Sequence, residues 1–178
     1  MAKTITITNG TGSAELINDS YTVTSNVTGY DNTSILPSSV DITAGTNSYA
    51  FTISATGTLT LHVTEDGTST GTPIVGATFI RTDSTGNQYG SVITTDSNGD
   101  AVFNNVPYAE SGAPTIYYLQ TASDGNHEFS NTVASTTMTT STATLEIQNA
   151  PGATRTITLT DTNYQNLPIE NGSITLTN

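Results

Sequence analysis

Three oxygen-bearing side chains stand at alternate positions in one short stretch of the sequence, Asp96, Asn98 and Asp100. This spacing can present oxygen ligands to a calcium ion. The EF-hand pattern also requires a glycine directly after the third ligand and a later bidentate glutamate, and the sequence has neither. The dipeptide Asn98-Gly99 is instead typical of a two-residue hairpin turn of type I′. We therefore predict a turn here and no metal site.

The other residues that could do chemistry are isolated in the sequence. His62 and His127 are the two histidines of the chain, and two histidines cannot complete a three-histidine zinc site. No carboxylate and nucleophile accompany either of them at a catalytic spacing, so we predict surface or packing roles. Glu65 and Asp66 are typical of solvated turn charges. The sequence thus predicts no enzyme, no catalytic residue and no cofactor.

The tyrosines are scattered over several predicted strands, and the chain has no tryptophan. Packing in the core and at its rim is therefore favoured over a sugar-binding platform.

The net charge of −12 rests on 15 acidic residues and only three basic ones. A phosphate backbone or an anionic membrane surface would be repelled, so neither nucleic acid nor a membrane is a predicted partner. The absence of cysteine excludes disulfides and thiolate metal sites. No apolar run approaches the length of a membrane span. The first residues lack the apolar core of a secretion signal, so we expect an extracellular protein whose signal was removed or that leaves the cell by another route.

The elements that carry these residues are predicted to be strands. Apolar and polar residues alternate, or β-branched residues follow one another, in short windows that are separated by Gly- or Asn-containing turns. No window shows apolar residues at helical spacing. The pattern predicts an all-β sandwich or barrel. The windows are residues 3–9, 21–27, 49–54, 58–64, 77–83, 90–96, 116–122, 143–149, 155–161 and 172–178.

Internal matches divide the chain into repeats. Two of them are long and gapless: residues 96–108 match 9–21, with Gly99 on Gly12, and residues 73–83 match 168–178. Shorter matches join 57–67 with 153–163, 117–125 with 21–29, and 144–147 with 50–53.

The N-terminal residues match the later part of the middle copy, and the C-terminal residues match its earlier part, so the order of the matches is circular. We therefore predict one whole β-sandwich at residues 57–149 and a second sandwich that is split. Its back half is residues 1–54, and its front half is residues 150–178.

The whole copy resembles the B-type repeat domain of Gram-positive collagen adhesins and pilins. The resemblance is carried by "TLTLHV", "PIVGATFIRTD", "TTDSNGDAVFNNVPY", "YYLQTASDG" and "LEIQN". It implies two Ig-like, prealbumin-like β-sandwich domains, one of them split, and a structural role at a cell surface.

Many members of that family contain an internal Lys–Asn isopeptide bond that an acidic residue promotes. The resemblance places Asn149 at the family's asparagine, His62 at its lysine and Gln120 at its acid. An amide cannot shuttle the proton and no amine is available, so we predict no isopeptide bond in the whole copy. A crosslink from Lys3, the one lysine, to a neighbour's asparagine is not expected.

The front half is predicted to complete the back half of a neighbouring subunit. Repeats of the family stack end to end, which implies that the first and last strands leave from opposite poles. The connector "NAPGA" spans at most about 18 Å, whereas the sandwich is on the order of 35 Å long. The apolar residues of the predicted subunit interface are Ile5, Ile7, Ile157, Leu159, Leu167, Ile169, Ile174 and Leu176.

A head-to-tail contact that does not close on itself produces a filament. The sequence therefore predicts a structural subunit of an extracellular or cell-surface, pilus-like fibre, a homopolymer of identical subunits joined by strand complementation. Two alternatives stay open. If the first and last strands left the whole sandwich from adjacent poles, the split sandwich would close within one chain. The protein would then be a compact monomer that serves as an adhesin stalk or a carbohydrate-binding module. A phage decoration or tail-fibre protein would also lack a secretion signal.

Overall fold

The fold is that of a computed structural model, which describes residues 2–176. These residues contain strands and no helix, as the alternating pattern predicts; in this part of the chain nothing helical could therefore cross a membrane. The strands are β1 (Asp19–Thr22), β2 (Tyr30–Leu36), β3 (Ser39–Ile42), β4 (Thr52–Thr64), β5 (Thr78–Thr82), β6 (Gln88–Thr94), β7 (Asp100–Pro107), β8 (Thr115–Ala122), β9 (Ala134–Thr137), β10 (Thr142–Gln148), β11 (Thr160–Asp161) and β12 (Leu167–Pro168).

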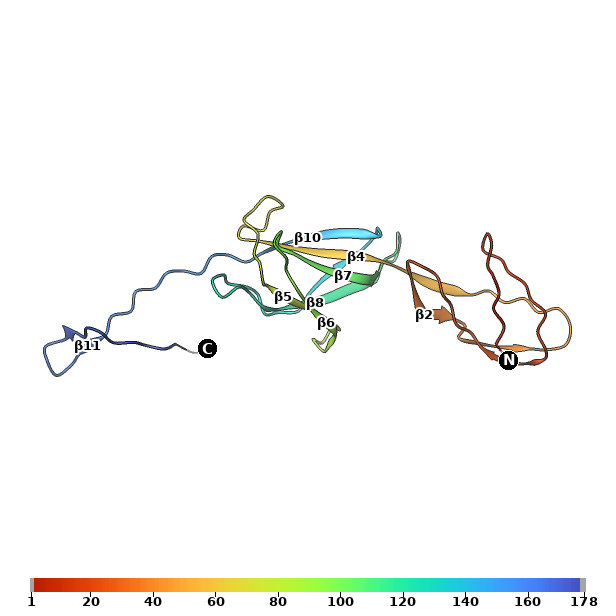
Figure 1. Cartoon of the computed structure of the whole chain (residues 1–178), viewed down its shortest axis with the longest axis horizontal. Helices are drawn as coiled ribbons and strands as arrows, with labels where there is room; N and C mark the ends of the chain where they lie inside the picture. Colours follow the sequence, from red (N-terminus) through yellow and green to blue (C-terminus); the bar gives the residue numbers. More distant parts are fainter. Residues whose placement is uncertain (1, 177–178) are drawn as a thin grey trace.

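The middle of the chain is a sandwich of two sheets (Figure 1). In one sheet the second half of β4 lies between β10, which is parallel to it, and β7, which is antiparallel. Leu61 of β4 is opposite Leu145 on one side and Ala101 on the other. The facing sheet has the order β6-β5-β8-β9 and is antiparallel throughout. The predicted all-β sandwich is confirmed for this part of the chain.

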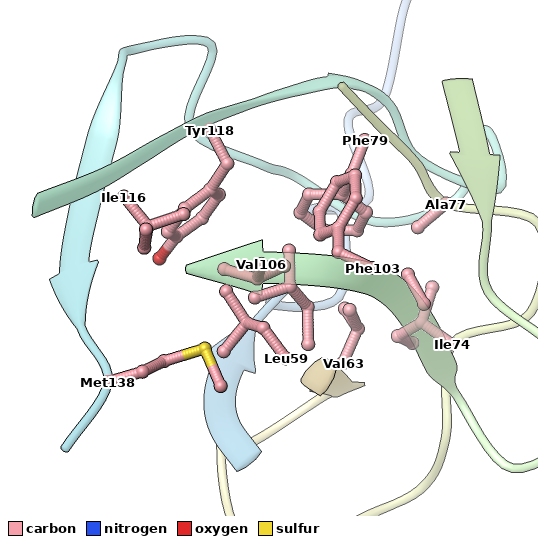
Figure 2. Close-up of a cluster of buried hydrophobic side chains, with 12 residues drawn as sticks. Leu59, Val63, Ile74, Ala77, Phe79, Phe103, Val106, Ile116, Tyr118 and Met138 are labelled. Atoms are coloured by element: carbon pink, nitrogen blue, oxygen red, sulfur yellow. The ribbon is translucent and has the colours of Figure 1, made fainter. Parts of the chain in front are cut away.

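The hydrophobic core fills the space between these two sheets (Figure 2). Leu59, Leu61 and Val63 reach it from β4 at every second residue, because side chains alternate between the faces of a strand. Phe79 of β5 and Tyr118 of β8 cover them from the other sheet, with ring centroids 6.5 Å apart and planes tilted by 54°. Among the described residues, every buried side chain lies between positions 56 and 149.

The residues before the sandwich form one separate two-stranded sheet and an extension of the β4 sheet, and they have no buried core of their own. β1 pairs with β3, with Tyr21 opposite Val40, and β2 pairs with the first half of β4. β4 is 13 residues long and passes from this part into the sandwich without a break. Under the internal match Tyr21 corresponds to Tyr117, which pairs with Ser135 of β9 in the same antiparallel manner.

The C-terminal segment forms a short hairpin, β11–β12, whose pairing also occurs in the sandwich. The backbone N–H of Ile169 donates to the carbonyl of Leu159 at 3.0 Å. In the sandwich the N–H of Ile74 donates to the carbonyl of Val63 at 2.9 Å. These are the same two positions under the internal match. The two segments therefore share a local backbone pairing as well as a sequence pattern.

The two partial segments lie at opposite ends of an elongated molecule (Figure 1). The N-terminal part is attached through β4 at one end of the sandwich, and the blue C-terminal segment leaves from the other. Three predicted strands do not form or form only in part here. Residues 3–9 contain a single bridge between Thr8 and Thr11, residues 172–176 are in no strand, and of residues 155–161 only Thr160–Asp161 form a strand. Residues 177 and 178 of the second prediction lie outside the described residues. The first two stretches lack a neighbouring strand, and a ladder requires one to satisfy the backbone groups.

The sandwich core generates a first prediction. Leu61→Ala removes a side chain that is 0% exposed, and a change of this kind costs about 2–5 kcal/mol of unfolding free energy. Val92→Ala on the exposed side of β6, where the side chain is 53% exposed, is the matched control and should change it by less than about 0.5 kcal/mol. Urea unfolding measures both. Equal effects would contradict the placement of the core.

Candidate subunit interface

All eight residues of the predicted interface are exposed in the single chain, with exposed fractions between 39% and 77%. Large apolar side chains that are fully covered are worth about 1.5–3 kcal/mol each relative to exposure. Scattered single exposures are normal on protein surfaces, but these residues recur at alternate positions of extended segments. They therefore form apolar faces that the isolated chain leaves open to solvent.

Four of these exposed residues match residues that are buried in the sandwich. The matched pairs are Ile157 with Leu61, Leu159 with Val63, Ile169 with Ile74, and Ile174 with Phe79, and each partner in the sandwich is at most 2% exposed. The same positions of the repeat are therefore core in the whole copy and surface in the C-terminal segment.

The structure does not bring the two groups of interface residues together within one chain. Ile5 and Ile7 precede the Thr8–Thr11 turn in the N-terminal part, whereas the other six residues belong to the C-terminal segment at the opposite end (Figure 1). Further apolar residues of the N-terminal part are also exposed, and the sequence analysis did not name them. They are Ile17, Val27, Tyr30, Leu36, Tyr49 and Phe51. Phe51 could have been found, because the internal match aligns it with Leu145, which packs against the core.

The first hairpin differs from its counterpart in the whole copy. Its turn residues are Asn9 and Gly10, with φ of 49° and 78°, the positive pair that a type I′ turn requires. Gly12, which the match places on Gly99, has no positive φ, and a Cβ there would stand 2.6 Å from the Thr6 carbonyl. Gly12 is thus conserved between the copies in sequence, but it allows a close approach here and does not form the turn.

The stretch with calcium-like spacing is a turn, although not the predicted type. Gly99 has φ of 81°, whereas Asn98 has no positive φ, which excludes type I′. The N–H of Gly99 donates to the Asp96 carbonyl at 3.0 Å, and the N–H of Asp96 donates to the Asp100 carbonyl at 3.1 Å. This is a type I turn closed by a bulge glycine. The Asp96 carboxylate accepts the N–H groups of Asp100 and Asn98, which lower its pKa.

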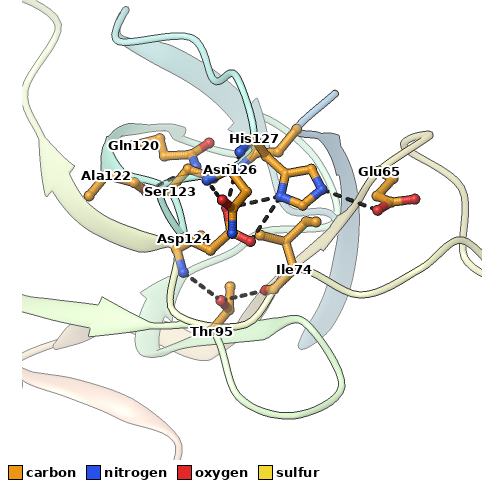
Figure 3. Close-up of polar contacts among 11 residues, drawn as sticks. Glu65, Ile74, Thr95, Gln120, Ala122, Ser123, Asp124, Asn126 and His127 are labelled. Carbon is orange, nitrogen blue, oxygen red and sulfur yellow. Dashed lines mark hydrogen bonds and ion pairs between the residues drawn. The ribbon is translucent and has the colours of Figure 1, made fainter. Parts of the chain in front are cut away.

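Each histidine is isolated in the sequence but has a carboxylate partner in space. His62 Nδ1 lies 2.7 Å from a carboxylate oxygen of Asp100 on the neighbouring strand β7. His127 lies between two carboxylates: Nδ1 is 2.9 Å from Asp124, and Nε2 is 3.1 Å from Glu65 (Figure 3). Glu65 is therefore not a free turn charge. Within residues 2–176 no group of three or more His, Cys, Asp or Glu side chains is arranged so that it could hold a metal ion.

Asn149 and Gln120 are both buried near the end of the sandwich. The Asn149 side chain donates to the Ser123 hydroxyl at 3.0 Å, and the Gln120 side chain donates to the Ala122 carbonyl at 3.1 Å. His62, which the resemblance placed at the family's lysine, lies between the inward-facing Leu61 and Val63 and on the outer face of β4. Asn149 and Gln120 thus donate to the loop at residues 122–123, whereas His62 pairs with Asp100 across two strands.

Comparisons with known proteins find similarity in solved structures only. The chain matches no family model and no curated protein. The TIE protein of Bacillus anthracis is 17% identical over 57% of this chain and 18% of that protein, with a TM-score of 0.44. The major pilin subunit of Bacillus cereus is 18% identical over 58% and 32%, with a TM-score of 0.44. The minor pilin of Streptococcus agalactiae is 15% identical over 67% and 61%, with a TM-score of 0.47.

This chain therefore spans between about a fifth and three fifths of the length of these three proteins.

The contacts of His127 generate a second prediction. The hydrogen bond with Asp124 raises the pKa of His127 above its ordinary value, burial opposes this, and the hydrogen bond with Glu65 adds to it. Asp124→Asn should therefore lower the His127 pKa, while Asp100→Asn, beside the other histidine, should leave it unchanged. Imidazole proton shifts followed by NMR across the pH range measure it. An unchanged His127 midpoint in Asp124→Asn would refute the assigned contact.

Proposed function

We propose that this chain is a structural subunit of an extracellular or cell-surface, pilus-like filament. The subunits assemble head to tail: the C-terminal segment, residues 150–178, completes the N-terminal part, residues 1–54, of the next identical subunit. Each junction is then a β-sandwich made from two chains.

The observation that carries the proposal is the contrast between matched positions. Ile157 and Leu159 are exposed, whereas their counterparts Leu61 and Val63 are fully buried between β10 and β7. The hairpin of the C-terminal segment already has the backbone pairing that its counterpart has in the sandwich. It therefore has the local form of a sandwich edge while its apolar face has no cover.

The internal match also specifies where the incoming strand lies. In the sandwich, Leu61 is opposite Leu145 of the parallel strand β10. Transferred by the match, Ile157 of one subunit lies opposite Phe51 of the next. The second incoming strand, around Ile174, takes the place of β5 between the counterparts of β6 and β8. Extended segments that lack a strand partner in the single chain receive one in this arrangement.

The energetics favour an obligate junction. The four apolar residues of the C-terminal segment whose counterparts are buried, at about 1.5–3 kcal/mol each, supply on the order of 10 kcal/mol before the costs of association. Main-chain pairing on both sides of each incoming strand adds to this. An interface made from half of a domain core belongs to the obligate class.

The placement of the segments supports completion between subunits. The C-terminal segment leaves the sandwich at the end opposite to the N-terminal part (Figure 1). Completion within one chain would require that segment to fold back along the length of the sandwich. Completion of a neighbour requires no such reversal, and because the two surfaces differ, the contact repeats without closing.

A third prediction tests the apolar face directly. Ile157→Asp places a charge at a position that is buried in the junction, so it should abolish filaments and leave the sandwich folded. Val75→Asp is the matched control, because Val75 and Ile157 are equally exposed in the single chain, at 53% and 54%. Negative-stain microscopy and size-exclusion chromatography measure assembly. Deletion of residues 154–178 should have the same effect as Ile157→Asp.

The outcome that would refute the proposal is equally direct. A wild-type chain that stays monodisperse at the mass of a single chain, 18.5 kDa, would exclude the filament. Filaments that persist in the deletion variant would exclude strand complementation as the mechanism.

A fourth prediction tests the register and separates the two modes of completion. The chain has no native cysteine, so Phe51→Cys with Ile157→Cys introduces the only thiols. The pair corresponds to Leu145 and Leu61 on parallel strands; neighbouring strands lie about 4.8 Å apart, within the Cα separation that a disulfide spans. Oxidation should produce a ladder of covalent multimers, because the two cysteines meet between chains. The control is Thr52→Cys with Ile157→Cys. The cysteine at position 52 points to the opposite face of its strand from position 51.

A single fast-migrating monomer band from the Phe51 and Ile157 pair would show completion within one chain. Equal ladders from both pairs would refute the proposed register.

A further inference from the structure

The C-terminal segment has one last attachment to the sandwich before it extends away. The N–H of Glu128 donates to the Ala150 carbonyl, and the N–H of Gly152 donates to the Asn126 carbonyl, both at 2.8 Å. His127, between them, forms an antiparallel bridge with Pro151. Among the described residues no backbone hydrogen bond joins the chain after Gly152 to the sandwich. This bridge therefore sets the direction in which the segment leaves.

The fit at this attachment is close. A Cβ on Gly152 would stand 2.8 Å from the carbonyl oxygen of Asn126, nearer than such atoms approach without displacement. The loop of residues 126–128 and the connector are thus in direct backbone contact, and movement of one moves the other.

The side chain of His127 joins this loop to the end of β4. Its ring contacts Asp124 on the loop and Glu65 directly after β4, and the side chain is only 13% exposed (Figure 3). Glu65 is itself held, because its N–H donates to the Thr72 carbonyl and its carbonyl accepts from the Gln148 side chain.

The two ring nitrogens of His127 both face carboxylates, which has a consequence for its protonation. A neutral imidazole has one N–H donor, whereas the imidazolium has two. Only the protonated ring can donate to Asp124 and Glu65 together; the neutral ring presents a lone pair to one of the carboxylates. Asp66 and Glu128 are the next acidic residues along these loops, and the Asp66 carboxylate accepts from Thr68. Asp124 and Glu65, the two acidic groups in contact with the ring, both favour the cation.

We propose that His127 is a pH-sensitive latch that holds the C-terminal segment in its assembly direction while protonated and releases it when neutral. The proposal rests on the proposed function, since it concerns how the segment is presented to the next subunit. A held segment loses less conformational entropy on joining its neighbour, so assembly is faster and the fibre stiffer when the latch is closed.

The sign of the pH dependence follows from the direction of the pKa change. The pKa of His127 is raised in the folded chain. The latch is therefore fully formed below the ordinary histidine value of about 6.5 and is lost as the pH rises through the higher folded value. Assembly should be favoured in mildly acidic surroundings.

The experiment follows the latch and the assembly separately. The latch is followed in the Ile157→Asp variant, which is expected to stay monomeric. The heteronuclear NOE of the Gly152 amide is measured between about pH 5 and about pH 8. The NOE should fall as the pH rises, with the midpoint of the His127 titration. His127→Gln should remove this pH dependence. His62→Gln, which changes the other carboxylate-paired histidine, should retain it.

Assembly is measured in the wild-type background by light scattering and microscopy over the same pH range. The assembly rate should fall with the same midpoint, and His127→Gln should make the rate independent of pH. A Gly152 NOE that does not change with pH, or that titrates equally in His127→Gln, overturns the latch. A titrating NOE in a wild-type chain that forms no filament at any pH overturns the proposed function and leaves the latch as a property of the monomer.

Discussion

The structure depends on one constraint, which is that every strand needs a hydrogen-bonding neighbour at its edges and a cover over its apolar face. β4 meets it in two different ways along its 13 residues. Its second half lies between β10 and β7 and contributes three buried side chains to the core. Its first half pairs with β2 on one side, and none of its residues before Thr56 is buried. One continuous strand therefore joins a satisfied sandwich to an unsatisfied partial sheet.

The two partial segments are complementary in what they lack. The N-terminal part contains the counterparts of the strands that flank β4 and β5 in the sandwich. It has no strands at the positions of β4 and β5 themselves. The C-terminal segment has the counterparts of β4 and β5, with their apolar residues exposed. Each end lacks what the other end has, so joining subunits end to end, as proposed, would satisfy both. In the proposed filament, the backbone contact of Gly152 with the Asn126 loop directs the C-terminal segment toward the next subunit.

The polar and ionisable residues of the chain serve this scaffold. Asp83 and Asp96 accept backbone N–H groups within two loops of the same kind, each closed by a glycine with positive φ, Gly86 and Gly99. His62 pairs with Asp100 across two strands. His127 differs because its partners come from two separate loops that meet where the C-terminal segment leaves. In the proposed latch its protonation is tied to the position of a segment and not only to the stability of a turn.

The sequence by itself determined the all-β class, the position of the core strands and the apolar positions of the C-terminal segment. Period-two alternation and turn residues are local signals, and Leu59, Leu61 and Val63 follow them directly. It could not determine the turn type at Asn98-Gly99, because the bulge there depends on the N–H groups of Asn98 and Asp100 donating to the Asp96 carboxylate. It also could not find the contacts of His127, since Glu65 is 62 residues away in the chain. Tertiary structure alone decided that residues 3–9 and 172–176 form no strand in one subunit, because pairing depends on a neighbour in space and not on the pattern of the strand itself.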